Sequence, residues 1–398
     1  MTAAADQGRC RVRRAPHLLC TWRADGLVVQ SARRAAGVPA SALVLELLEN
    51  LGAWIEVDRL AVSVGIPTAA LDVLLAGLRE HDLIEEEAPG HGALDGDADA
   101  DAGPWGLWSP AAEFFHLATR DIPVSRQSAG PRPEVTRPPA TLAPQGWTRI
   151  ALPRPRLGHA SLRGALHQRR THRRFGVGAV SLPALGTLLG VTFGVQAWAL
   201  ADEGPLALKT SPSGGARHSL EAYVWARRVA GVPAGLYHYR PDDHVLTRLD
   251  DRRVPERVIE WLPVQDGYED AGVLVALSSE LARVSWRYRN ARAYRVVLLE
   301  AGHLGQTFCL TAAALGLAPF CTAALADSVI EHDLGLDGRA QPVLYMVGAG
   351  SCADGAWQPH GGRPAPRLDV TDLGRALSGR ATRRSSGPPR PHRRASGR

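Results

Sequence analysis

The chain has 398 residues, of which 45% are hydrophobic, so it is long enough for two or three domains with their own cores. Its formal charge of +6 is concentrated at the end: residues 380–398 contain seven arginines and no acid, and the rest of the chain carries a charge of −1. This distribution excludes a basic, nucleic-acid-binding body. We interpret residues 356–398, rich in Pro and Arg, as a disordered tail.

The sequence contains no run of about eighteen apolar residues and no N-terminal apolar core followed by a cleavage site. We therefore expect a cytoplasmic protein that does not enter a membrane. Its five cysteines, Cys10, Cys20, Cys309, Cys321 and Cys352, are odd in number and lack CxxC spacing. This pattern predicts reduced thiols, with Cys309 and Cys321 in the core, and argues against a disulfide framework or a structural metal site.

Residues 1–119 predict a winged-helix-like domain. Its expected elements are a helix at 40–49, a strand at 54–57, a helix at 58–64 capped by Asp58, a turn at 65–67, a helix at 68–81, a wing strand at 83–87 and a flexible loop at 90–103. A DNA-reading second helix presents cations and amides to DNA, but residues 68–82 offer Arg79 against three acids. We therefore expect this domain to bind protein or peptide, such as a leader peptide, or to dock on the rest of the chain.

Residues 120–155 form the next segment, which contains Pro131, Pro133, Pro138, Pro139 and Pro144 and shows little periodicity. We expect an extended linker, or an arm lying over a partner surface. A larger domain follows at 156–355. It is expected to contain a helix at 162–168, a helix capped by Ser181, strands at 221–229, 235–240 and 244–249, a buried strand at 271–278, a long apolar helix at 293–315 and a last strand at 342–347.

Two polar motifs in this domain match what flavin mononucleotide (FMN) requires. In RRTHRRF, residues 169–175, two guanidinium groups and a hydroxyl alternate and can converge on a phosphate. Residues 211–215, Ser-Pro-Ser-Gly-Gly, supply hydroxyls, a fixed turn and backbone without Cβ atoms that can lie against a ring. Taken singly, the motifs could be a solvated basic face and an ordinary loop. The residues expected to bind the cofactor are Arg169, Arg170, Thr171, Arg173, Ser211, Pro212, Ser213, Gly214 and Gly215.

Four segments between Pro155 and Gly350 occur in a recognisable order: RRTHRRF, TSPSGGARHSLEAYV, GLYHYRPDDHVL and WRYRNARAYRVVLLEAGHLGQTFCLTAAALGL. Together they resemble the SagB-type dehydrogenases, nitroreductase-like flavoenzymes of azole-containing peptide biosynthesis. The resemblance implies an α+β fold with a central mixed or antiparallel sheet flanked by helices, and a homodimer with the long helix at its core. It also implies cofactor contacts from Gln306 and from the loop of Thr322, Ala323 and Ala324.

Arg287 and Tyr288 occupy the place where the family usually shows a Lys-Tyr pair implicated in azoline oxidation. A lysine can become a neutral base, whereas an arginine stays charged. We therefore expect Tyr288 to accept or relay the proton with Arg287 as its electrostatic partner. The alternatives are that Tyr288 merely packs and Arg287 pairs with an acid, or that the chemistry differs.

Three further polar residues have open roles. His303 lies one helical turn after Glu300, and we expect a buried, hydrogen-bonded histidine there and no metal ligand. His218 and Glu221 either face the substrate or cap a helix.

The leading hypothesis is an FMN-dependent dehydrogenase that oxidises thiazolines or oxazolines in a ribosomally made precursor peptide, acting with a cyclodehydratase. The alternative enzyme is an NAD(P)H-dependent nitro- or quinone-reductase-like oxidoreductase that acts on small molecules. The third possibility is a flavin-sensing regulator that binds DNA, against which the acidic second helix argues. The N-terminal extension and the Pro-rich arm favour a peptide partner, because a small-molecule reductase needs neither.

Overall fold

The computed structural model describes residues 11–16, 18–32, 34, 37–87, 105, 107–108, 110–122, 136–143, 148–202 and 204–353. The predicted flexible loop at 90–103, the parts of the linker at 123–135 and 144–147, and the predicted tail at 356–398 lie outside the described residues. Predictions for those segments stay predictions.

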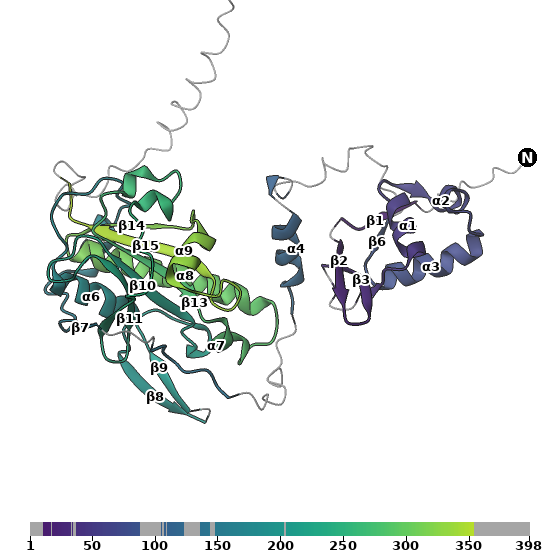
Figure 1. Cartoon of the computed structure of the whole chain (residues 1–398). Coiled ribbons are helices and arrows are strands. Elements are labelled where there is room, and N and C mark those ends of the chain that lie inside the picture. Colours follow the sequence, from purple (N-terminus) through teal and green to yellow (C-terminus); the bar gives the residue numbers. More distant parts are fainter. Residues whose placement is uncertain are drawn as a thin grey trace, which may run out of the picture.

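The N-terminal unit combines short strands with three helices around a small apolar core (Figure 1). Its elements are β1 (Arg11–Arg14), β2 (Leu18–Arg23), β3 (Gly26–Ser31), β4 (Val38–Pro39), α1 (Ala42–Asn50), β5 (Ile55–Glu56), α2 (Val57–Val64), α3 (Thr68–Glu80) and β6 (Ile84–Glu86). The sheets have the orders β5-β1-β6 and β2-β3-β4. Leu47, Leu60, Leu71 and Leu75 are buried between the helices.

The predicted helices of this unit and its last strand are confirmed, whereas strands β1 to β4 were not predicted from the sequence. The expected Asp58 cap is wrong. Helix α2 begins at Val57, so Asp58 already lies in its first turn, and the N-cap residue Glu56 makes no side-chain capping hydrogen bond. Gly65, with φ of +65°, ends α2 in the left-handed conformation, which is the turn that the sequence predicts.

Helix α4 (Pro110–Ala118) packs on the start of the long helix α8 (Arg292–Ala314). The rings of Phe115 and Tyr294 meet edge to face with centroids 6.0 Å apart, and Arg292 Nη1 donates to the carbonyl of Thr119 at 3.0 Å. In Figure 1, α4 stands between the N-terminal unit and the larger domain. Its contacts tie it to the larger domain, although the predicted boundary assigns it to the first.

The larger domain is built on a seven-stranded sheet of order β14-β15-β13-β10-β11-β12-β7, and every neighbouring pair is antiparallel. Its strands are β7 (Arg149–Ala151), β10 (Leu220–Ala226), β11 (Gly235–Arg240), β12 (Val245–Arg248), β13 (Val273–Ser279), β14 (Ala318–Thr322) and β15 (Val343–Gly350), and β8 (Ala197–Ala201) and β9 (Gly204–Leu208) form a separate hairpin. Its helices are α5 (Leu162–Gln168), α6 (Leu182–Phe193), α7 (Leu281–Ser285), α8 and α9 (Asp327–Leu334), with single turns η2 (Gly214–Ala216), η3 (Val258–Glu260) and η4 (Asp266–Tyr268).

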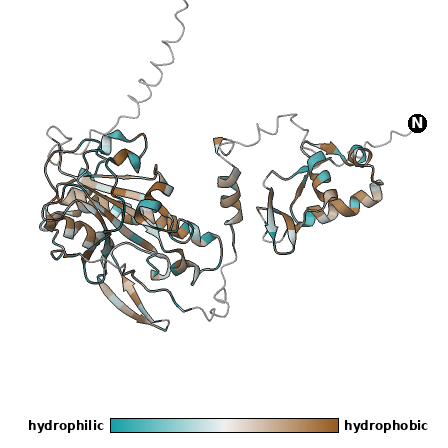
Figure 2. Ribbon diagram, in the orientation of Figure 1, coloured by the Kyte–Doolittle hydropathy of each residue, from teal (hydrophilic) through white to brown (hydrophobic). Residues whose placement is uncertain are grey.

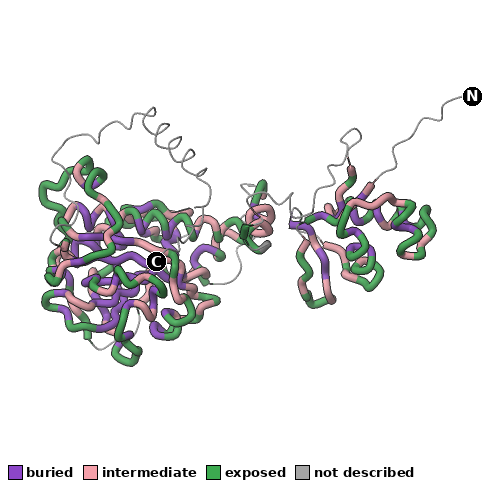
Figure 3. The backbone as a smooth tube through the Cα atoms, turned by 90° about the horizontal axis from the view of Figure 1, so that it is seen from above, coloured by how far each residue is buried: buried purple, intermediate pink, exposed green. Residues whose placement is uncertain are grey.

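Apolar residues cover both faces of this sheet. On one face α6 and α8 pack through residues such as Leu188 and Phe308, and on the other the η3–η4 segment and α9 pack through Trp261 and Ile330. Hydrophobic residues are concentrated in the sheet and in α6 (Figure 2), and buried residues follow the strands (Figure 3). All residues of β13 are buried, which confirms the predicted central strand. The architecture is α+β with an antiparallel sheet.

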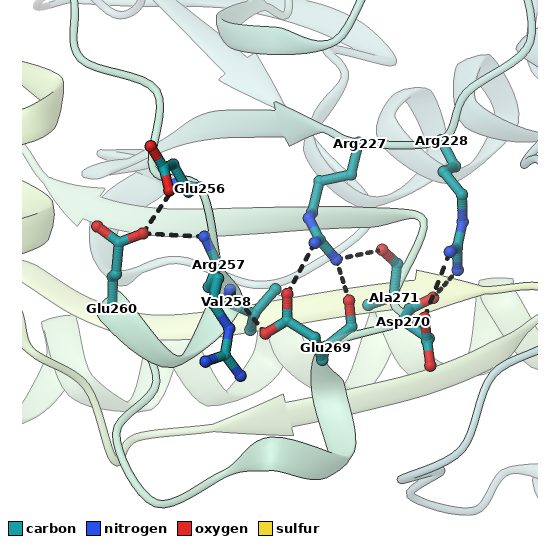
Figure 4. Close-up of polar contacts among 9 residues, drawn as sticks. All are labelled: Arg227, Arg228, Glu256, Arg257, Val258, Glu260, Glu269, Asp270 and Ala271. Carbon is teal, nitrogen blue, oxygen red and sulfur yellow. Dashed lines mark hydrogen bonds and ion pairs between the residues drawn. The ribbon is translucent and has the colours of Figure 1, made fainter.

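The η3–η4 segment is held on the sheet by two arginines that follow β10 (Figure 4). Arg227 pairs with the carboxylate of Glu269 at 3.0 Å, and the other oxygen of Glu269 accepts the backbone N–H of Val258 at 3.0 Å. The guanidinium group of Arg228 donates to both the side-chain carboxylate and the backbone carbonyl of Asp270. These contacts place Gln265 and Tyr268 beside β14, where the site described below is located.

Helix α8 has 23 residues and is long and apolar enough to cross a membrane, a feature that the sequence analysis missed. However, 56% of its most apolar window is buried inside the protein, as in a core helix. Helices α2 and α3 pass the same test only as a pair, and they are bent by 106° at their junction. These features are weak evidence for a membrane span.

Candidate functional site

The Ser/Gly loop, residues 211–215, lies along one face of α8. Three residues of that face, Glu300, His303 and Thr307, hold it. Ser213 Oγ donates to Glu300 Oε2 at 2.5 Å, Ser211 Oγ lies 2.6 Å from Thr307 Oγ1, and His303 Nδ1 lies 3.3 Å from the Pro212 carbonyl. Both serine hydroxyls, expected to face the cofactor, therefore already have partners within the chain. Their first role is to fix the loop on the helix.

The two glycines of this loop lack a Cβ atom at positions where side chains of other elements lie close to the loop backbone. A Cβ on Gly214 would lie 2.5 Å from Val296 Cγ1, and one on Gly215 would lie 2.6 Å from Tyr288 Oη. Gly215 also has φ of +61°, which disfavours any side chain. The structure thus brings the predicted catalytic residue Tyr288 directly against the predicted cofactor loop.

Arg287 accompanies Tyr288, with its guanidinium carbon 5.8 Å from the centre of the tyrosine ring. Tyr288 is half-buried and packs on the apolar cluster of α6, α8 and the sheet. The contact observed for Arg287 is therefore a cation–π contact with Tyr288. Part of the alternative interpretation, that Tyr288 packs, holds as well.

The arginine motif leaves the end of α5 and runs beside β14. The His172 N–H donates to the Pro319 carbonyl at 2.9 Å, and the buried Phe175 ring meets Phe320 edge to face. Of the other side chains of the motif, Arg170, Thr171 and Arg173 are exposed, whereas Arg169 is half-buried. Arg173 also packs against η4, where a Cβ on Gly267 would lie 2.9 Å from the Arg173 carbonyl oxygen.

The predicted loop of Thr322, Ala323 and Ala324 follows β14 and depends on Gln265, which the sequence analysis missed. Thr322 Oγ1 donates to Gln265 Oε1 at 2.9 Å, and Gln265 Nε2 donates to the Ala324 carbonyl at 2.6 Å. The arginine motif and this loop therefore share one support, the η3–η4 segment. Because α5 and β14 also pack on α8, both lie on the helix that holds the Ser/Gly loop.

The polar donors of the arginine motif fit a phosphate group. Guanidinium groups supply paired N–H donors and a threonine supplies a hydroxyl, the donor set that phosphate monoesters prefer in proteins. Arg169, Arg170, Arg173 and Thr171 are the residues that would hold it. Gln306, also expected at the cofactor, is exposed on α8 one turn after His303.

A buried polar cluster lies behind the Ser/Gly loop. His238 Nε2 lies 2.7 Å from Glu221 Oε2, and Arg283 Nη1 lies 2.5 Å from Glu221 Oε1. Burial raises the pKa of Glu221, but the hydrogen bond from His238 and the charge of Arg283 outweigh this effect and lower the pKa from 4.5 to about 2. Glu221 is therefore a structural carboxylate within the sheet, neither facing a substrate nor capping a helix.

Two other groups near this cluster have depressed pKa values. Burial, and then the charge of Lys209, lower the pKa of His218 to about 4. Burial is the main cause of the lowered pKa of Lys209, the only lysine in the chain. Its position two residues before the Ser/Gly loop was the signal that could have drawn attention to it.

His303 is exposed, so its expected burial is wrong, while its expected hydrogen bond is present. Its ring contacts the Pro212 carbonyl of the Ser/Gly loop and remains open to solvent. Within the described ranges, no group of three or more His, Cys, Asp or Glu side chains could hold a metal ion.

Comparison with known proteins identifies the class of this fold. The model of the nitroreductase family matches residues 166–351. The putative nitroreductase MJ1384 of Methanocaldococcus jannaschii is 30% identical over 192 residues, which are 48% of this chain and 92% of that protein. The chain therefore belongs to the nitroreductase family. Members of this family typically bind flavin, and the protein is a nitroreductase-family flavin oxidoreductase.

Two further similarities are more distant. The trifolitoxin-processing protein TfxB of Rhizobium leguminosarum bv. trifolii is 33% identical over 134 residues, which are 32% of this chain and 36% of TfxB. The chain thus spans about a third of the length of TfxB. A solved structure, a putative nitroreductase from Ralstonia eutropha, is 23% identical with a TM-score of 0.43, and the match covers 53% of this chain and 95% of that one.

Proposed function

We propose that this protein is an FMN-dependent dehydrogenase that oxidises azolines to azoles in a ribosomally synthesised precursor peptide, as the SagB-type dehydrogenases do. The observation that carries the proposal is the placement of Tyr288, with Arg287 over its ring, against Gly215 of the Ser/Gly loop. The similarity to TfxB, named for trifolitoxin processing, supports a peptide substrate. A cyclodehydratase would supply the azoline, and the proposed location is the cytoplasm.

In this proposal the side chains divide the work. FMN, when bound, supplies the hydride acceptor. Arg169, Arg170, Arg173 and Thr171 hold its phosphate, and Gly214 and Gly215 leave the loop backbone bare beside Tyr288. Tyr288 acts as the base in its phenolate form: its oxygen takes the proton that leaves the azoline carbon and becomes a neutral hydroxyl, and the fixed charge of Arg287 stabilises the phenolate before the transfer.

The first test is the cofactor itself. We expect the purified protein to be yellow, to release FMN on heating, and to lose it when Arg169 and Arg173 are both changed to Ala. Arg163→Ala is the matched control, because Arg163 is an exposed arginine of α5 outside the motif. A protein that stays colourless after addition of FMN, while folded by circular dichroism, would refute the flavin site.

The second test is turnover of a synthetic peptide that carries one thiazoline. Oxidation to the thiazole removes two hydrogen atoms, which mass spectrometry detects, and it reduces the flavin under anaerobic conditions. Flavin that stays oxidised in the presence of azoline peptides, but is bleached by dithionite, would refute the dehydrogenase proposal.

The N-terminal unit is proposed to be a winged-helix-like domain that recruits the leader peptide. It has its own apolar core, formed by residues such as Leu47 and Leu71, so it can be removed as a unit. The deletion should end before residue 105, since α4 packs on α8. Weaker binding of a fluorescent precursor peptide with unchanged flavin content is expected, and unchanged peptide affinity would contradict the role.

A small-molecule reductase is the second candidate, favoured by the match to 92% of the putative nitroreductase MJ1384. It predicts that NADPH or NADH reduces the bound flavin rapidly and that a nitroaromatic compound or a quinone reoxidises it. Stopped-flow absorbance with NAD(P)H and with azoline peptide, run in parallel, discriminates the two functions.

A homodimer through α8 is also proposed. This helix leaves Leu298 and Leu299 exposed, while residues such as Val297, Ala301 and Leu304 are buried in the domain. Adjacent exposed leucines on a helix whose other apolar residues are mostly buried are typical of a surface that a partner covers. Light scattering after size exclusion gives the mass in solution.

A further inference from the structure

Four side chains from four different elements meet behind the arginine motif. The Cys309 thiol of α8 and the Tyr345 hydroxyl of β15 both interact with the Cys321 sulfur of β14. Arg169, at the end of α5, interacts electrostatically with both sulfurs. Tyr268 of η4 is the further titratable group that senses the charge of Cys321. Two cysteines that looked like separate core thiols are therefore neighbours.

The backbone is shaped to allow this cluster. A Cβ on Gly305 of α8 would lie 2.5 Å from Cε1 of Tyr345 and 3.2 Å from Cδ1, so a glycine at this position lets the tyrosine ring approach the helix closely. Cys309 follows Gly305 by one turn on the same helix face. In the sheet, Cys321 pairs with Val347, two residues along β15 from Tyr345. Helix and strands thus bring the phenol hydroxyl and both thiols together.

The two sulfurs differ in charge and access. Interaction with the Cys309 thiol, then with the Tyr345 hydroxyl and the charge of Arg169, lowers the pKa of Cys321 from 9.0 to about 6, which favours the thiolate at neutral pH. Interaction with Cys321, together with burial, raises the pKa of Cys309. Cys321 is half-buried and Cys309 is buried. A partly accessible thiolate next to a protonated thiol is the arrangement of a redox-sensitive pair.

We propose that Cys321 and Cys309 form a peroxide-sensitive site, in which Cys321 is the reacting sulfur and Cys309 resolves it to a disulfide. The Cys321 sulfur attacks one oxygen of hydrogen peroxide, the O–O bond breaks, and the other oxygen leaves as water after taking a proton from solvent. The Cys309 sulfur then attacks the sulfenic acid sulfur, the S–O bond breaks, and the oxygen leaves as water with the Cys309 proton. Overall, two thiols and one peroxide give one disulfide and two waters.

The thiol pair lies next to two elements of the proposed flavin site, so its oxidation can affect that site. Cys321 immediately precedes the loop of Thr322, Ala323 and Ala324, and Arg169 opens the arginine motif. Both elements belong to the proposed flavin site, so oxidation changes the charge and the position of groups that border it. The inference does not require the proposed function, because it names its own oxidant and concerns the thiols alone.

Mass spectrometry of the full-length protein tests the disulfide. Trypsin releases residues 296–339 as one peptide, because no Arg or Lys lies between Arg295 and Arg339, and the cysteines in this peptide are Cys309 and Cys321. After brief treatment with hydrogen peroxide, we expect this peptide to lose the mass of two hydrogen atoms. Cleavage after Leu315 by chymotrypsin should leave its halves joined until a reductant is added.

Variants separate the two roles. In Cys309→Ser, Cys321 should stop at the sulfenic acid and be trapped by dimedone, whereas Cys321→Ser should leave Cys309 unmodified. Alkylation of Cys321 by iodoacetamide should have its midpoint near pH 6, and Tyr345→Phe should move it upward. Cys352 is the control: it is exposed, and burial of its sulfur raises its pKa above the usual 9.0, so it should react at higher pH.

Three results would each overturn the proposal. The first is a tryptic peptide that keeps both thiols free after peroxide treatment. The second is a disulfide that joins Cys321 to Cys20 or Cys352 in place of Cys309. The third is a Cys321 alkylation profile that coincides with that of Cys352.

Discussion

Replacing Arg283 by methionine tests the buried ion pair that supports the Ser/Gly loop. The substitution keeps a long side chain and removes the cation. In the native protein Arg283 binds the Glu221 carboxylate at 2.5 Å and donates to the carbonyls of His218 and Pro139 at 2.9 and 2.7 Å. After the change, Glu221 keeps its hydrogen bond with His238 but stays buried without its guanidinium partner.

The expected cost is large because the charge that remains is inaccessible to water. Arg283 and Glu221 are 2% and 5% exposed in their side chains. Breaking such a pair costs about 3–5 kcal/mol, a large part of the roughly 5–15 kcal/mol that keeps a domain folded. We therefore expect Arg283→Met to fold only marginally at neutral pH.

The pH dependence gives a second magnitude. The pKa of Glu221 falls from 4.5 to about 2 in the folded protein. Because the folded pKa is the lower one, its stabilisation is fully present above the unfolded pKa and is lost as pH falls through the folded one. The shift corresponds to about 3 kcal/mol near pH 7, of which about 2 kcal/mol is lost by pH 3.

Urea unfolding followed by tryptophan fluorescence measures both effects. The stability difference between wild type and Glu221→Gln should shrink by about 2 kcal/mol between pH 7 and pH 3. The variant that combines Arg283→Met with Glu221→Gln should lose less free energy of unfolding than the sum of the losses in the two single variants. Arg163→Met, at an exposed arginine of α5, is the control and should stay within about 0.5 kcal/mol of wild type. Arg283→Met within about 1 kcal/mol of wild type, or a difference independent of pH, would refute the reasoning.

Three further predictions concern the site and the long helix. Tyr288→Phe should lower kcat for azoline oxidation about 10²- to 10⁴-fold at unchanged flavin content, and turnover within about threefold of wild type would contradict its role. Leu299→Asp, at a side chain that is 62% exposed, should convert the proposed dimer to monomer by light scattering, and an unchanged mass would exclude that interface. Gly305→Ala should destabilise by about 1–3 kcal/mol, because its Cβ would strike the Tyr345 ring, whereas Gly302→Ala meets open space and should not. Equal thermal unfolding of the two alanine variants would argue against that packing.

Local features of the sequence determined most of the larger domain. Ser181 caps α6 as predicted, accepting the N–H of Ala184, and Ser161 caps α5 in the same way by accepting the N–H of Gly164. The apolar periodicity of α8 and the apolar run of β13 predict both elements within one or two residues. These predictions succeed because capping bonds and burial periodicity involve residues close together in the chain.

Only the tertiary structure decided which distant residues meet. Tyr288 leaves no room for a Cβ at Gly215, and Gln265 holds Thr322 by a hydrogen bond. Groups on three other elements lower the pKa of Cys321. Each contact depends on the order of strands in the sheet and on the face that α8 turns toward it. Sequence spacing records neither, because packing between elements is chosen by the whole core rather than by neighbours along the chain.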